Sequence, residues 1–142
     1  MRPYEFILAT GAGLDKLGAM LERAALAAGH PPAIVARAPR MPHRAPLVVI
    51  VAARARGRKI VSLFEQQLTA GCAVMAMQMA AVAQGFGGIW RSGWPMFDRS
   101  LHDALELARD DQIVGFLYLG TPASAPGEQS PPVEPEDFIR WL

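Results

Sequence analysis

The longest run of small and apolar side chains lies between Leu63 and Gly85. It contains no proline, and its alanine, methionine, leucine and glutamine residues favour helix. Apolar positions fall on every side instead of forming one stripe, as in a helix that is buried all round. Gly85 suits the left-handed residue that closes a helix. The pattern therefore predicts a central buried helix over Leu63–Gln84, which we also expect to lie at a subunit interface.

Four shorter runs have the character of β-strands. Leu47–Ala53 and Ile113–Leu119 are continuously apolar, which is typical of strands covered on both faces. Tyr4–Thr10 is rich in strand-forming residues and ends at a glycine turn. Gly87–Ser92 follows the glycines that end the central helix. These runs predict a sheet built from segments distributed along the whole chain.

Three further segments have helical features. Leu14–Ala28 places apolar residues at the spacing of an amphipathic helix, and Pro32–Arg37 is long enough for a short one. Asp98 or Ser100 can cap a helix that runs to Ala108. The alternation of strands and helices predicts an α+β fold, a mixed sheet flanked by helices, over residues 1–120.

The last part of the chain, residues 121–142, has a different composition. Most of it is a tract of proline, serine, glycine and glutamate that cannot form a core of its own. It nevertheless ends in the apolar sequence Phe138–Leu142. We expect an extended C-terminal arm that docks on a partner subunit.

Composition narrows the class of protein. The 142 residues suffice for one domain with its own core, and a 51% hydrophobic content with a mean hydropathy of +0.17 suggests surface hidden against another subunit. A net charge of +1 argues against a nucleic-acid partner. Gln78 interrupts the alanine-rich helix, so we expect no membrane span. The basic residues cluster in the first half and are interpreted as a solvated face, or as a field that attracts an anionic cofactor: Arg37, Arg40, Arg44, Arg54, Arg56, Arg58 and Lys59.

Cysteine and histidine usage offers little chemistry. The single Cys72 excludes an internal disulfide and fits a reducing cytoplasm, and its apolar neighbours predict a small buried side chain. No signal peptide is visible. His30, His43 and His102 lack partners at ligand spacing, so we expect no metal site.

Two other features have ordinary explanations. Gly11-Ala12-Gly13 lies between a strand and a helix, but the next glycine is Gly18, which is too far along for a dinucleotide-binding fingerprint. Glu65, near the start of the central helix, must be paired or at the helix mouth, where it interacts favourably with the helix dipole.

The segment Gly85–Gly93 is the strongest candidate site. Its glycines uncover backbone N–H groups, so a flat ligand can approach the main chain. Trp90 can stack on a ring, Arg91 can meet an anionic oxygen, and Ser92 can donate to a carbonyl. Such a set suits a redox cofactor that carries the chemistry itself.

Two stretches of the chain closely resemble the FMN-dependent NAD(P)H nitroreductase family, in its compact YdjA-like branch. They are AGCAVMAMQMAAVAQGFGGIWRSG and, further along, IVGFLYLGTP. The resemblance extends from Met1 to Leu142 and includes the Arg-Ala-Pro-Leu string at Arg44. It implies a homodimer with a nitroreductase-like, mostly antiparallel α+β fold and FMN at the subunit interface. It also implies ping-pong transfer of hydride from NAD(P)H, through the flavin, to a nitroaromatic or quinone, with no indispensable catalytic side chain.

The family's functional residues carry over by position. The resemblance places flavin contacts on Trp90, Arg91 and Ser92. The family's nicotinamide segment falls on residues that we expect to be mostly buried: Ala80, Ala81, Val82, Ala83, Gln84 and Gly85. The resemblance also implies that the C-terminal arm crosses to the other subunit.

The start of the chain departs from the family pattern. The resemblance implies that family members begin about forty residues before Met1, with an Arg-Arg-Ser helix that grips the flavin phosphate, and Arg2-Pro3-Tyr4 stands where Gln-Pro-Trp is expected. Loss of charge-assisted bonds worth about 1.5–3 kcal/mol each weakens phosphate binding. Either Met1 is an internal methionine or the chain is a shortened relative. Two hypotheses follow: an FMN-dependent oxidoreductase, or a flavin-free homodimer with a binding or structural role.

Overall fold

The computed structural model describes residues 2–57, 60–123 and 134–142, and these residues form one four-stranded sheet. Its strands are β1 (Tyr4–Thr10), β2 (Leu47–Ala53), β3 (Gly87–Arg91) and β4 (Gln112–Gly120), in the order β1-β2-β4-β3. All three strand pairings are antiparallel. The α+β class and the mostly antiparallel sheet are therefore confirmed, and no parallel pair occurs among the described strands.

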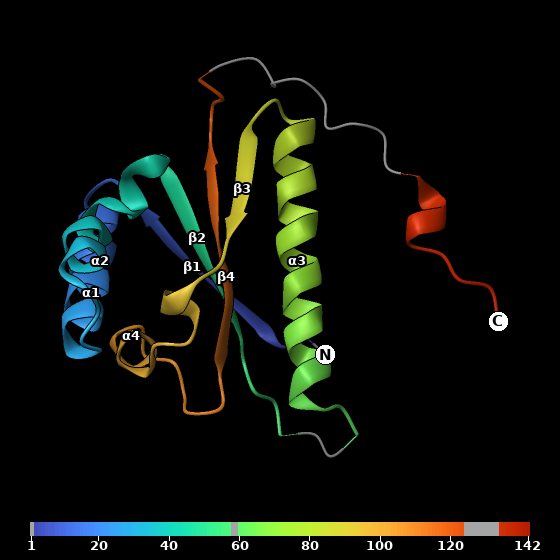
Figure 1. Cartoon of the computed structure of the whole chain (residues 1–142), viewed down its shortest axis with the longest axis horizontal. Helices are drawn as coiled ribbons and strands as arrows, with labels where there is room; N and C mark the ends of the chain where they lie inside the picture. Colours follow the sequence, from blue (N-terminus) through green and yellow to red (C-terminus); the bar gives the residue numbers. More distant parts are fainter. Residues whose placement is uncertain (1, 58–59, 124–133) are drawn as a thin grey trace.

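The two central strands are the continuously apolar runs of the sequence. Val48–Ala53 of β2 are all buried, and so are Phe116 and Leu117 of β4. A central strand has neighbours on both edges, and here helices cover both of its faces (Figure 1). Both faces must therefore be apolar, as the sequence predicted.

The helices form a layer on each side of the sheet. Figure 1 shows α1 (Ala12–Ala27), α2 (Pro32–Arg37) and α4 (Arg99–Ala104) on one side and α3 (Leu63–Ala83) on the other. Side chains of β2 alternate between the two cores: Val48 and Ile50 contribute to the α1 side, and Val49 to the α3 side. The fold therefore has two separate apolar clusters divided by the sheet.

The ends of α3 follow the sequence signals closely. Ser62 caps its N-terminus: the hydroxyl accepts from the Glu65 N–H at 3.2 Å, and the Glu65 carboxylate accepts from the Ser62 N–H at 2.8 Å. These bonds satisfy backbone groups that the first helical turn leaves free, and they hold the pKa of Glu65 below its ordinary value. Gly85, just past the helix, has φ of 84°. Glu65 is thus at the helix mouth, as expected.

Within this chain, α3 is not buried all round, which corrects the prediction. Only Gln66, Ala70, Val74 and Ala81 are buried. Cys72 is exposed, contrary to the small buried side chain that we expected. The physical reason is that a helix lying on one face of a sheet contacts it along a single stripe. The apolar outer side chains remain uncovered, and the large ones are Leu63, Phe64, Leu68, Met75, Met79 and Val82.

The remaining expectations have mixed outcomes. The helices predicted at Leu14–Ala28 and Pro32–Arg37 are confirmed within a few residues, since α1 spans Ala12–Ala27 and α2 spans Pro32–Arg37. Asp98 caps α4, accepting from the Leu101 N–H at 2.8 Å, but α4 ends at Ala104 instead of Ala108, and Glu106 then has φ of 57°. Gly11 forms a turn before α1.

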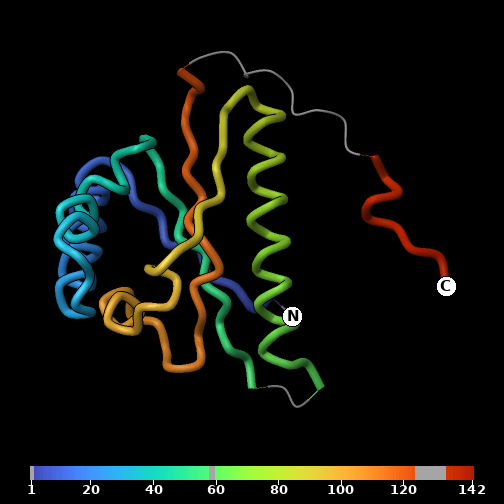
Figure 2. Tube along the Cα trace, viewed as in Figure 1, coloured from blue at the N-terminus to red at the C-terminus, as the bar shows by residue number. Residues whose placement is uncertain are grey.

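The C-terminal arm is only partly described, since residues 124–133 lie outside the described part of the chain. Residues 134–142 are exposed, and Figure 2 shows them apart from the sheet and its helices. No helix in the described ranges has both the length and the apolar character needed to cross a bilayer.

Candidate functional site

Trp90 and Arg91 point to opposite faces of β3. The Trp90 ring lies on the α3 side, where a Cβ added at Gly71 of α3 would be 3.4 Å from it. Its Nε1 donates to the Val114 carbonyl at 3.2 Å. A Cβ at Gly115 would be 1.9 Å from that nitrogen, so glycine is required there. Trp90 therefore fixes edge strand β3 to β4, and it faces away from the cavity that Arg91 lines.

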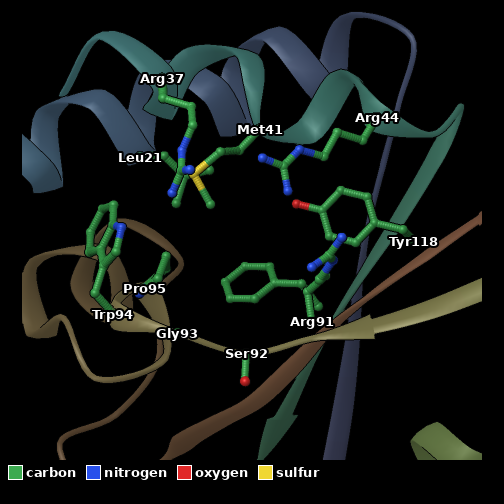
Figure 3. A pocket seen from close by; sticks show the side chains of 11 residues that line it. Leu21, Arg37, Met41, Arg44, Arg91, Ser92, Gly93, Trp94, Pro95 and Tyr118 are labelled. Atoms are coloured by element: carbon green, nitrogen blue, oxygen red, sulfur yellow. The ribbon is translucent and has the colours of Figure 1, made fainter. Parts of the chain in front are cut away.

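Arg91 lines a cavity of about 450 Å³ on the other side of the sheet, which we call the arginine cavity (Figure 3). Helices α1 and α2, the connection from α2 to β2, the residues after β3, and strand β4 all contribute to its wall. The lining residues are Leu21, Arg37, Met41, Arg44, Arg91, Ser92, Gly93, Trp94, Pro95, Phe116 and Tyr118.

The arginine cavity carries an uncompensated positive charge. Among the described residues, no carboxylate lies within 4.0 Å of the guanidinium groups of Arg37, Arg44 and Arg91. Burial raises the pKa of Tyr118, while the charges of Arg44 and Arg91 act in the opposite direction. Tyr118 is therefore a neutral donor beside two cations.

Ser92 contributes to this cavity differently from the way we predicted. Figure 3 shows its hydroxyl directed away from the three arginines. Successive side chains of an extended chain alternate between faces, and Ser92 follows Arg91 directly. The surface that Ser92 gives to the cavity is therefore mainly its backbone.

A second cavity, also about 450 Å³, adjoins the first and shares Arg44, Arg91 and Tyr118 with it. We call it the glycine cavity because Gly87, Gly88 and Gly120 line it. Any side chain at these positions would crowd its neighbours: a Cβ at Gly120 would be 2.7 Å from Pro46, and one at Gly88 would be 3.0 Å from Leu119. The cavity thus presents bare main chain next to two guanidinium groups.

Gln78 positions part of this glycine-rich wall. Its Nε2 donates to the Gly88 carbonyl at 3.0 Å. The polar residue that interrupts the apolar sequence of α3 therefore ties the helix to the start of β3. This hydrogen bond fixes the peptide that follows the glycine turn.

The predicted nicotinamide segment, Ala80–Gly85, lies at the end of α3. Only Ala81 is buried, which corrects the expectation that most of the segment is buried. Ala80, Ala81 and Gln84 line an almost wholly apolar recess of about 380 Å³. This apolar recess shares Pro46 and Gly120 with the glycine cavity.

Sequence reasoning did not select Arg37, Arg44 or Tyr118. The two arginines belong to a basic run that was interpreted as a solvated face or as a field that attracts an anionic cofactor. Tyr118 belongs to an apolar run that predicts only a buried strand. The one local signal was that Arg44 opens the Arg-Ala-Pro-Leu string. Among the described residues, no group of three or more His, Cys, Asp or Glu side chains could hold a metal ion.

The chain is similar to known proteins along its whole length. Residues 1–121 match the family model described as the nitroreductase family. YdjA of Escherichia coli K12, named as a proposed NAD(P)H nitroreductase, is 43% identical over 142 residues, which are 100% of this chain and 78% of YdjA. A Haemophilus influenzae protein with the same kind of name is 30% identical over 143 residues, with the same coverage.

Two solved structures show the same fold at lower identity. A nitroreductase-like protein from Bacillus cereus has a TM-score of 0.77 and 21% identity, covering 99% of this chain and 73% of its own. The FMN and NADPH-dependent nitroreductase NfnB from Sphigopyxis sp. strain HMH has a TM-score of 0.67 and 14% identity, covering 99% and 80%. With the family model matched over residues 1–121 and a relative 43% identical along the whole chain, this protein belongs to the nitroreductase family of oxidoreductases.

Proposed function

We propose that the protein is an FMN-dependent oxidoreductase that uses NAD(P)H to reduce nitroaromatic or quinone acceptors. The observation that carries this proposal is the glycine cavity. It combines bare main chain at Gly87 and Gly88 with the guanidinium groups of Arg44 and Arg91, on a chain that belongs to the nitroreductase family.

The residues of the glycine cavity fit a flavin. A planar ring can approach the backbone where glycines leave no side chain in the way. Arg44 and Arg91 can donate charge-assisted hydrogen bonds to anionic oxygens, and the neutral Tyr118 hydroxyl can donate to a carbonyl. We retain Arg91 as a flavin contact, and we propose that the Ser92 main chain, which lines only the adjoining arginine cavity, contacts the flavin where the two cavities meet. For Trp90 we propose the supporting role of holding β3 in place.

A bound flavin supplies the redox chemistry. In the overall reaction, NAD(P)H loses a hydride, and a quinone gains two electrons and two protons, the second proton coming from solvent. The task of Arg44 and Arg91 is to bind and orient, and their positive charge favours a ligand that becomes more negative on reduction. We propose no side chain as a catalytic acid.

We also propose that the segment Ala80–Gly85 contacts NAD(P)H, but only through part of the dinucleotide. The apolar recess can shelter a flat ring, but no charged side chain lines it. Phosphate groups need cationic or N–H donors. We therefore propose that this recess holds at most the ring end of the dinucleotide and that the phosphates lie elsewhere.

We further propose a cytoplasmic homodimer. The outer side of α3 exposes large apolar side chains, including Leu68 and Met79, and a second copy of the chain can cover them. In the same assembly, the arm of residues 121–142 would dock its exposed Phe138 and Trp141 on the partner.

Flavin binding tests the proposal directly. Purified protein is mixed with FMN, freed of unbound ligand and examined for the visible absorption of a bound flavin. NAD(P)H oxidation is then followed with a quinone and with a nitroaromatic. We expect a yellow protein whose turnover needs both FMN and the acceptor. A colourless protein that does not bind added FMN would contradict the proposal and favour the flavin-free homodimer with a binding or structural role.

A further inference from the structure

Arg37 has no place in the proposed flavin site. It lines the arginine cavity but not the glycine cavity, and it comes from the last turn of α2. Figure 3 shows its side chain extending from α2 into the cavity that Leu21 and Met41 also line. A third cation beside Arg44 and Arg91 adds repulsion among like charges unless a negative group binds there.

Two further donors in the arginine cavity lack partners among the described residues. Trp94 Nε1 is fully buried and makes no hydrogen bond, and it lies on the edge of the indole that faces the cavity (Figure 3). Tyr118 is only 8% exposed, and its hydroxyl points toward Arg44. A buried donor without a partner destabilises the folded protein, because the group has lost its hydrogen bond to water. A ligand that offers only acceptor atoms would satisfy the Tyr118 hydroxyl, and a small shift of the Trp94 ring would bring its N–H to the same ligand.

The rest of the wall is apolar, including Leu21, Met41, Pro95 and Phe116. Sites of this kind bind compact molecules whose orientation is set by a few polar groups. A cavity of about 450 Å³ has room for a one-ring compound. A cavity with apolar walls, whose polar side chains act as hydrogen-bond donors, favours a ligand that consists of an aromatic ring with a carboxylate.

We propose that the arginine cavity is an acceptor subsite for aromatic carboxylates, in which Arg37 binds the carboxylate as a specificity residue. This inference rests on the proposed function. The two cavities share Arg44, Arg91 and Tyr118, so an acceptor held here lies next to the proposed flavin site. The preferred substrates are therefore nitrobenzoates or carboxylated quinones, and their neutral counterparts bind less tightly.

Binding can be measured without flavin or turnover. The protein is labelled with ¹⁵N at tryptophan, and the indole signal of Trp94 is identified by its loss in W94F. The protein is then titrated with 4-nitrobenzoate and with the neutral 4-nitrobenzamide. We expect the Trp94 signal to shift with the carboxylate, and the carboxylate to bind about tenfold more tightly than the amide, the usual scale of one charge-assisted contact.

Two charge-matched variants separate a specific contact from a general field. R37Q removes the cavity arginine, and R40Q removes an exposed neighbouring arginine that does not line the cavity. We expect R37Q to lower nitrobenzoate affinity about tenfold and nitrobenzamide affinity less than twofold, whereas R40Q changes neither. Equal losses in both variants, or equal wild-type affinity for acid and amide, would overturn the proposal.

The anion could instead be the phosphate of the flavin, and a second arm of the experiment distinguishes this source. FMN and riboflavin, which differ by the phosphate, are titrated against wild type and R37Q. If R37Q weakens FMN but not riboflavin and leaves nitrobenzoate binding intact, the acceptor assignment is wrong. A protein that binds nitrobenzoate through Arg37 but never binds FMN keeps the subsite and loses the proposed function.

Discussion

At the scale of single residues, the alternation of side chains along β3 divides structural from binding roles. Trp90 is held on the α3 side by its bond to Val114 and by the space above Gly115. Arg91, its neighbour in sequence, lies on the other side with Arg44 and Tyr118. Arg91 makes no ion pair with a described residue, so its charge is available to a ligand.

Replacing Arg91 with alanine (R91A) separates its role in flavin binding from its role in folding. Because Arg91 is exposed and unpaired among the described residues, we expect the free energy of unfolding to change by less than about 0.5 kcal/mol. FMN affinity should fall at least about tenfold, since one charge-assisted bond is lost. Flavin titration and urea unfolding measure the two quantities, and R23A, which removes an exposed arginine of α1, is the control. Unchanged FMN affinity in R91A would remove Arg91 from the site.

At the scale of elements, His102 connects the short helix α4 to strand β4. The side chain is fully buried, its Nδ1 donates to the Asp98 carbonyl at 2.7 Å, and its Nε2 accepts from the Ile113 N–H at 3.3 Å. Since Nε2 is an acceptor, the ring is neutral and carries its proton on Nδ1. Burial lowers the pKa of His102, and the bond to Asp98 opposes this only in part.

This arrangement predicts a dependence of stability on pH. The unfolded chain, in which His102 has its ordinary pKa of 6.5, takes up a proton before the folded protein does. The contribution of neutral His102 is therefore complete above about pH 6.5 and is lost as the pH falls through the lowered folded pKa. We expect H102Q to be less stable than wild type at pH 7 by about 1–3 kcal/mol, with a smaller difference at pH 5.

Urea unfolding of wild type and H102Q at pH 7, 6 and 5 measures this difference. His30 and His43 are present in both proteins, so any contribution they make cancels in the comparison. A difference that stays constant over this range would show that His102 does not control the pH dependence.

At the scale of the whole molecule, the two sides of the sheet differ in how completely the chain covers them. Helices α1, α2 and α4 share one side, while α3 lies on the other with its apolar outer surface exposed (Figure 1). An exposed patch of this kind marks an interaction site. We expect a second copy of the chain to cover it.

Matched leucine variants test this assembly. Leu68 of α3 is 54% exposed and Leu26 of α1 is 60% exposed, so L68D and L26D introduce the same charge at similar exposure on different surfaces. We expect wild type and L26D to sediment as dimers, and L68D to dissociate at least about tenfold more readily because a buried contact acquires a charge. A monomeric wild type at micromolar concentration, or equal behaviour of the two variants, would contradict this assembly.

The sequence by itself determined the features that depend on local chemistry. Glu65 was placed at the start of α3 and Gly85 at its end, because helix-end interactions and a left-handed turn involve residues close in the chain, whereas the Ser62 cap was found only in the structure. The apolar runs Leu47–Ala53 and Ile113–Leu119 identified the central strands. Arg91 was selected as a candidate ligand contact from the glycine-rich segment around it.

The tertiary structure decided which of these residues meet. Arg37, Arg44 and Tyr118 are distant in sequence, and only the packing of α2 and the loop before β2 against β4 brings them to one cavity. The antiparallel pairing, the exposed side of α3 and the separation of Trp90 from Arg91 likewise depend on register and layering. Periodicity shows that a side chain is apolar or charged, but its neighbours are set by contacts between distant segments, which no local pattern encodes.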